Sequence, residues 1–130
     1  MRITAKLIFC ISIVQFAVGC SASLPEQCRQ LKTAKELLND SYYKSEKETD
    51  KDKKTALLTE SFSQKAKTVE SIQISDSNLK AVQTRIVKYN NDFAKWSLDG
   101  SFSKASVKEL KDLVQESKNI DNDLKAICSN

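Results

Sequence analysis

The sequence predicts an all-α protein, an antiparallel up-down-up-down four-helix bundle closed by one disulfide. Three observations lead to this fold class. Apolar residues recur at alternating steps of three and four through most of the chain, which is the spacing of one face of an α-helix. After the first nineteen residues there is one proline, Pro25, and one glycine, Gly100, too few for a turn-rich β fold. Two cysteines, Cys28 and Cys128, lie near the two ends of the same region.

The segment 76–100 is the clearest helix, and the other helices are organised around it. It opens at the capping residues of 75–77 and closes at Asp99 and Gly100, where glycine can adopt the left-handed conformation that ends a helix. Six apolar residues fall on one stripe: Leu79, Val82, Ile86, Tyr89, Phe93 and Trp96. A helix with a single apolar stripe needs partner helices to cover it.

Three flanking segments carry weaker stripes of the same kind. The first helix is predicted over 25–43, with an apolar side formed by Leu24, Cys28, Leu31, Leu38 and Tyr42. The second stripe consists of Leu58, Phe62, Ala66, Val69 and Ile72. The fourth helix starts at Ser103 or Ser106 and carries Leu110, Val114, Ser117, Ile120 or Asp121, Leu124 and Ile127. The charged stretch 44–54 is expected to be a solvated turn or the exposed ends of two helices.

The first nineteen residues, 1–19, form a secretory signal peptide. Arg2 and Lys6 supply its positive start, and the apolar run 7–18 that follows is too short for a membrane-spanning helix. The remainder, 20–130, has the length of one domain, and its residues 20–24 are expected to act as a flexible tether. We therefore expect an exported protein.

Two cleavage sites compete at the end of this leader. The segment 17–20, Ala-Val-Gly-Cys, is similar to a bacterial lipobox, in which the cysteine after the cut, here Cys20, is lipidated and anchors the protein to a membrane. Gly19 fits the motif, whereas Ala17 departs from it, because leucine is usual at that position. Cleavage near Ala22 or Ser23 would instead release a soluble extracellular protein. The sequence favours lipidation and leaves the second alternative open.

The cysteine count predicts a disulfide between Cys28 and Cys128. Cys10 leaves with the signal peptide and Cys20 is either lipidated or removed, so an even pair remains in an exported chain. In an up-down-up-down order, the first helix starts at the end of the bundle where the fourth helix finishes, which also brings the pair together. The bridge would close a loop of about a hundred residues, for which chain entropy assigns about 4 to 5 kcal/mol of stabilisation.

Composition excludes most catalytic and cofactor chemistry. The chain has no histidine and its one methionine is Met1, which excludes histidine-based catalysis, histidine-ligated metals and an axial haem methionine. One glycine after the leader cannot make a glycine-rich phosphate loop. The segment 121–123 lacks the glycine and the terminal glutamate of an EF-hand, and a solvated helix face is the better interpretation. We expect no metal, no cofactor and no enzymatic activity.

The charge balance gives no sign of nucleic-acid binding. The full chain has 21 basic and 17 acidic residues, and removal of Arg2 and Lys6 leaves 19 basic residues and a net charge near +2. Nucleic acid requires a concentrated basic face, whereas the two signs are mixed in this chain.

Apolar residues at the end of the 76–100 helix offer a candidate contact surface for a partner protein. Trp96, Leu98 and Phe102 could form a small exposed patch at the end of the bundle away from the anchor, and such patches mark interfaces. The alternative is internal packing, with Trp96 on the core stripe and Phe102 covering the turn at Gly100.

The segments 17–20 and 74–96, together with Cys28 and Cys128, resemble small exported helical lipoproteins of bacteria. The resemblance is to a general class without a named family, and it implies a periplasmic or cell-surface location. We therefore expect a non-enzymatic cell-envelope lipoprotein that binds or scaffolds an unknown protein partner. The alternative is a soluble secreted effector or inhibitor without an anchor. An enzyme that relies on carboxylates alone would need them on inward faces, where the stripes are apolar.

Overall fold

A computed structural model describes residues 22–99 and 104–129. The predicted signal peptide, Cys20 and Phe102 lie outside the described residues. Every regular element in these two ranges is an α-helix, which confirms the all-α fold class. The helices are α2 (Leu24–Glu36), α3 (Asp40–Lys47), α4 (Lys51–Glu70), α5 (Ser77–Asp99) and α6 (Lys104–Cys128). Leu24, the last residue of the predicted tether, is thus the first residue of α2.

The central helix α5 follows the prediction. The side chain of Asp76 accepts a hydrogen bond from the backbone N–H of Leu79 at 2.8 Å and so caps the first turn. The first half of the predicted stripe is buried and the second half is half-buried: Leu79, Val82 and Ile86, then Tyr89, Phe93 and Trp96. The three-four spacing therefore identified the packed side in the first half of this helix, whereas in the second half the buried residues are Asn90 and Ala94, which lie beside the predicted stripe.

The first predicted helix is wrong as a continuous element, because the chain leaves the helix at Leu37 and begins a new one after Asn39. The Asn39 side chain accepts a hydrogen bond from the backbone N–H of Tyr42 at 3.2 Å. Its amide also donates to the backbone carbonyl of Ser61 in α4 at 2.8 Å. Such side-chain hydrogen bonds to the backbone compete with helix continuation. Leu38, predicted on the apolar side, is 42% exposed as a result.

The charged stretch 44–54 forms the exposed ends of two helices, the second of the two predicted alternatives. Helix α3 continues to Lys47, and α4 begins at Lys51 after an N-cap at Asp50. The Asp50 carboxylate accepts a hydrogen bond from the backbone N–H of Lys53 at 2.9 Å. The connection between α3 and α4 is therefore short and the charged side chains lie in solvent.

Helix α3 packs against α4 through small hydroxyl residues. Ser41 and Ser45 of α3 are buried, as is Ser61 of α4. Ser45 donates its hydroxyl proton to the backbone carbonyl of Tyr42 at 2.6 Å. The larger Tyr43 is 51% exposed on the same short helix. The contact is therefore close and mostly polar, and it leaves apolar surface outside.

One end of the molecule is closed by the disulfide and by two buried glutamines. The disulfide between Cys28 in α2 and Cys128 in α6 is formed, with the two Cα atoms 5.9 Å apart, which confirms the predicted pair. Gln27 accepts a hydrogen bond from the backbone N–H of Ser75 at 2.8 Å and so ties the α4–α5 loop to α2. Gln83 donates to the backbone carbonyl oxygens of Val69 and Ile72, both at 2.7 Å. These bonds satisfy carbonyls that the end of α4 leaves without a helical partner.

The apolar core lies at this closed end. Its buried members are Cys28, Leu31, Ala34, Val69, Leu79, Val82, Ile86, Ile120 and Leu124. In α6, Ile120 rather than Asp121 occupies the inward position that the sequence left open. The prediction that Val114 packs inward is wrong, because Val114 is 45% exposed and Leu113 is buried in its place.

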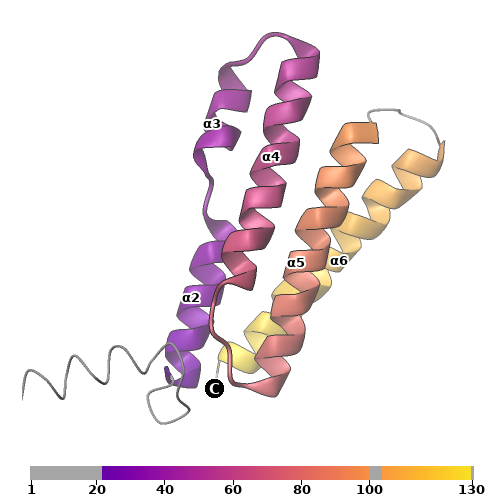
Figure 1. Cartoon of the computed structure of the whole chain (residues 1–130). Helices are drawn as coiled ribbons and strands as arrows, with labels where there is room; N and C mark the ends of the chain where they lie inside the picture. The colour runs from indigo at the N-terminus through magenta and orange to yellow at the C-terminus, as the bar shows by residue number, and fades with distance from the viewer. Residues whose placement is uncertain (1–21, 100–103, 130) are drawn as a thin grey trace, which may run out of the picture.

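At the opposite end the helices separate into two arms. Figure 1 shows α3 and α4 diverging there from α5 and the first half of α6. Among the described helices, α3 packs against α4 alone, whereas α6 packs against α5 and α2. The first half of α6 is therefore covered on one side only.

Replacement of both cysteines, Cys28→Ala with Cys128→Ala, should lower the free energy of unfolding by about 4 to 5 kcal/mol, because the unbridged chain regains the entropy of a loop of about a hundred residues. Equilibrium urea unfolding measures the change. Reductant should bring the wild type to the stability of the double variant and leave the variant unchanged. A wild type that is insensitive to reductant would contradict this role of the disulfide.

Candidate functional site

A cavity of about 170 Å³ lies where the two arms separate. Residues from α2, α4, α5 and α6 line it: Lys35, Phe62, Lys65, Ile86, Tyr89, Asn90, Ser117 and Ile120. We call it the junction cavity. Its walls combine apolar side chains with a few convergent polar groups, which is the usual composition of a binding site.

An aromatic cluster forms the wall between α4 and α5. The ring centroids of Phe62 and Phe93 are 4.4 Å apart, and those of Tyr89 and Trp96 lie 5.9 and 5.4 Å from Phe93. All four rings are half-buried. Aromatic pairs at these separations are favourable beyond the area they bury, so this wall of the junction cavity is well supported.

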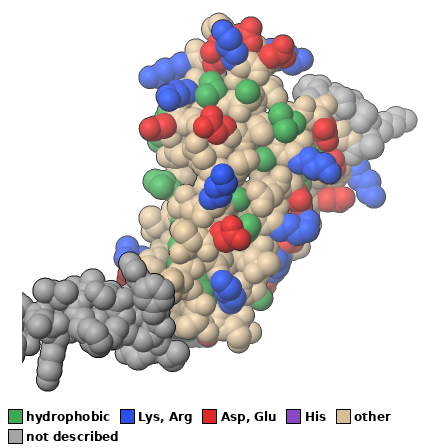
Figure 2. Space-filling model, in the orientation of Figure 1, with side chains coloured by type: hydrophobic (Ala, Val, Ile, Leu, Met, Phe, Trp, Pro, Cys, Tyr) green, Lys and Arg blue, Asp and Glu red, His purple; other side chains and the backbone are tan. Residues whose placement is uncertain are grey.

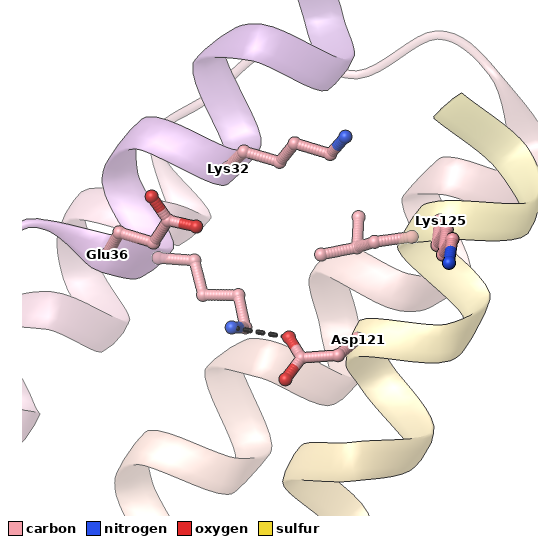
Figure 3. Close-up of a pocket in the computed structure, with 6 residues that line it drawn as sticks. Lys32, Glu36, Asp121 and Lys125 are labelled. Atoms are coloured by element: carbon pink, nitrogen blue, oxygen red, sulfur yellow. Dashed lines mark ion pairs between the residues drawn. The ribbon is translucent and has the colours of Figure 1, made fainter. Parts of the chain in front are cut away.

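An ion pair between Lys35 and Asp121 joins α2 to α6 beside the cavity. The Lys35 Nζ lies 2.7 Å from the Asp121 carboxylate. Figure 3 shows Lys32 and Glu36 of α2 across a hollow of about 230 Å³ from Asp121 and Lys125 of α6. Both signs of charge are present on both helices, so this hollow is an ordinary solvated seam between α2 and α6.

Lys65 is the charged residue of the junction cavity that no neighbour compensates. It is half-buried and has no ion-pair or hydrogen-bond partner in the described part of the chain. Burial lowers the pKa of its ammonium group, and the positive charge of Lys35 lowers it further. The nearby Asn90 uses its amide within α5, where it donates to the Ile86 carbonyl at 2.9 Å. A positive charge is therefore held in a half-buried site without an internal counterion.

A second hollow, of about 350 Å³, lies between α5 and α6, and its two cations, Arg85 and Lys88, are both paired with carboxylates. Arg85 donates to both oxygens of Glu116 at 2.7 and 3.1 Å and also to Asp123. These hydrogen bonds lower the pKa of Glu116. The acidic segment 121–123 is thus engaged in ion pairs through Asp121 and Asp123. Within the residues that the structure describes, no group of acidic residues and cysteines is placed to hold a metal ion.

One face of α6 continues from the junction cavity without a covering helix. Val107, Val114, Ser117 and Asp121 follow one another at steps of seven, three and four, so they share a face. Ser117 lines the cavity and Asp121 pairs with α2, which orients this face toward α2. Because α2 ends at Glu36, Val107 and Val114 are 42% and 45% exposed. We call these two residues the open valine face.

The structure describes two residues of the contact patch predicted from the sequence, Trp96 and Leu98. The Trp96 Nε1–H donates to the backbone carbonyl of Ser106 at 3.0 Å, and the ring packs on Phe93, so Trp96 serves mainly to join α5 to α6. Leu98 is 61% exposed. Since Phe102 lies outside the described residues, the three-residue patch stays a prediction.

Sequence reasoning missed Lys35, Lys65 and Asn90. The signal for Lys65 was its position three residues after Phe62, which places a charge on the edge of the apolar stripe of α4. The signal for Lys35 was of the same kind, because either Ala34 or Lys35 could occupy the missing step in the apolar stripe of the first helix.

Neither the visible surface nor the comparisons with known proteins indicate a function, so the function is inferred from the geometry of this site. Figure 2 shows basic and acidic side chains interspersed over both arms on the face in view, without a concentrated basic surface there. No helix in the described ranges combines the length and the apolar character that a membrane span requires. Comparisons with protein-family models, with curated proteins and with solved structures found no significant match.

The uncompensated charge of Lys65 should make stability depend on pH. Its folded-state pKa lies below the ordinary value of 10.5, so the unfolded chain binds more protons as pH rises toward that value. The free energy of unfolding of the wild type, relative to Lys65→Met, should therefore rise with pH in this range and level off above it. Urea unfolding across the range measures the difference. The matched variant Lys67→Met removes an exposed lysine, and if it showed the same rise, burial of Lys65 would not be the cause.

Proposed function

We propose that this protein is a non-enzymatic cell-envelope lipoprotein whose helical domain binds or scaffolds another protein. The exposure of Val107 and Val114, on the face of α6 that reaches the junction cavity at Ser117, carries the proposal. Apolar side chains next to a pocket at a helix surface are typical of protein interfaces, where a few buried anchors supply most of the binding free energy. A protein partner would cover this surface and fill the cavity with a side chain.

The proposed architecture is an antiparallel up-down-up-down bundle in which α2 and α3 share the first position. Cys28 pairs with Cys128, and Lys35, seven residues later, pairs with Asp121, seven residues earlier, which supports opposed directions for α2 and α6. Four further pairs have the same opposed sense: Val69 with Gln83, Phe62 with Phe93, Arg85 with Glu116, and Trp96 with Ser106. The two arms would then lie at the end away from the disulfide.

Lipidation of Cys20 supplies the proposed membrane anchor. Gln27 donates to the backbone carbonyl of Ala22 at 2.6 Å, and Ser23 caps α2 by accepting from the backbone N–H of Glu26 at 3.4 Å. Cleavage after Ser23 would remove both contacts, whereas a cut before Cys20 keeps them. The anchor would emerge beside the disulfide, and the arms with the open valine face would extend away from the membrane.

A soluble secreted effector or inhibitor is the second candidate. It is favoured by Ala17, which stands where a lipobox usually has leucine. The binding surface would be the same in both cases. The two candidates differ in the location of the partner, which is the membrane surface in one case and the extracellular medium in the other.

The intact mass of the protein from its native host should correspond to a chain that starts at Cys20 and carries acyl chains, since the lipobox directs both cleavage and modification. Mass spectrometry with and without reductant should also show the gain of two hydrogen atoms that accompanies opening of one disulfide. A Cys20→Ala variant should lose the acyl mass. An unmodified chain that starts near Leu24 would instead establish the secreted alternative.

A photo-crosslinking residue at position 114 should yield a discrete protein adduct in the native host, because Val114 lies on the proposed contact surface. The same crosslinker at position 84 should yield none, since Thr84 is exposed on α5. Val107→Asp should reduce the adduct at 114 by about tenfold, because a carboxylate at an apolar interface costs about 1.4 kcal/mol or more. Equal labelling from positions 114 and 84 would refute this surface as the contact site.

A further inference from the structure

The half-buried charge of Lys65 indicates the chemistry of the missing neighbour. A buried or half-buried ammonium group is costly unless a counterion or several hydrogen-bond acceptors surround it. Lys35, the other cation of the junction cavity, has Asp121 at 2.7 Å. Lys65 has no such partner within the described ranges. The cavity therefore combines an apolar wall, formed by Phe62 and Ile86, with one positive charge that a bound carboxylate would neutralise.

The shape of the surrounding surface indicates the size of that neighbour. The segment of α6 from residue 104 to Ser117 is about 20 Å long at 1.5 Å per residue. Along this length α6 presents Val107 and Val114, seven residues apart on one face, and α3 does not pack against it. A cavity of about 170 Å³ is smaller than the roughly 300 to 1,000 Å³ of small-molecule sites, and it suits one side chain. A second helix fits both the length and the cavity.

Building on the proposed protein-binding function, we propose that the partner presents an amphipathic helix with an acidic side chain. Its apolar residues pack on Val107 and Val114, and its carboxylate enters the junction cavity and pairs with Lys65. The partner helix takes the place beside α6 that a continuous first helix would have filled, had α2 not ended at Glu36.

A second copy of this chain fits the surface less well. Two copies related by a twofold axis would present the same patch to each other, as isologous interfaces require. The lining of the junction cavity contains no acidic residue among those the structure describes, so a second copy of this patch would bring no carboxylate for Lys65. An acidic helix brings the complementary charge.

The test is a selection among helical peptides against the full-length protein. The probes are stapled helices of about 15 residues. Leucines occupy the helical three-four spacing, and each remaining position carries glutamate, glutamine or lysine. Selection should enrich glutamate at one position. The selected peptide should bind at least about tenfold more tightly than its Glu-to-Gln counterpart, the gain expected of a charge-assisted hydrogen bond. Fluorescence anisotropy measures both affinities.

Variants of the protein assign the effect to the proposed contacts. Lys65→Met should abolish the preference for glutamate over glutamine, whereas Lys67→Met should retain it. Val114→Asp should lower the affinity for both peptides by the same factor, because the substitution disrupts the apolar contact that both peptides share. Thermal unfolding of each variant identifies any loss of folding, and Lys65→Gln provides a second neutral variant that keeps a polar side chain.

Several outcomes would overturn the proposal. The proposal is wrong if the selected helices show no preference for glutamate. It is also wrong if the preference for glutamate over glutamine persists in Lys65→Met. If sedimentation measurements showed a dimer that Val114→Asp dissociates, the occupant of this surface would be a second copy of the chain and not a partner helix. Binding of dodecanoate through Lys65 without any binding of helices would make the occupant an amphiphile. If position 114 yields no adduct in the host while the acidic peptide binds as expected, the proposed function fails and the chemistry of the site stands.

Discussion

The covalent link between Cys28 and Cys128 fixes the end of the molecule at which α2 meets α6. Around it the apolar core and the buried side chain of Gln27 hold the α4–α5 loop in place. The buried amide group of Gln27 is thereby satisfied close to the bridge, whereas the Oε1 atom of Gln83 is buried without a hydrogen-bond partner among the described residues. The remaining helices are positioned from this end, because α2 contacts α4, α5 and α6 there. The packing of the whole domain depends on that one closed end.

The opposite end is open for a reason that can be traced to Asn39. Its side chain binds the backbone of α4 through Ser61, and the chain therefore turns out of α2 and runs along α4 as α3. The first half of α6 loses the cover that a longer first helix would give. Exposed valines and a half-buried lysine are the result. A single hydrogen bond between α4 and the residue before α3 thus decides where the proposed binding surface lies.

Periodicity predicted the first half of α5 well because Leu79, Val82 and Ile86 all belong to the buried apolar core. The cysteine pair was predictable because two cysteines in an exported chain allow only one pairing. The break at Asn39 was not predictable, since it depends on a residue twenty-two positions away. The junction cavity was not predictable for the same reason, because it forms where four helices separate. The sequence pattern pointed to Lys65, a charged residue at the edge of an apolar stripe. The lipid anchor at Cys20 and the patch with Phe102 remain predictions.

The position of the bridge has a mechanical consequence. Tension applied between the chain before Cys28 and the chain after Cys128 passes directly through the two sulfur atoms. The hundred positions that separate the cysteines then carry no load. Helices α4 and α5 would keep their packing under a pull that would unwind the reduced protein from both ends. A domain tethered at one terminus and pulled through the other would behave as a short inextensible link.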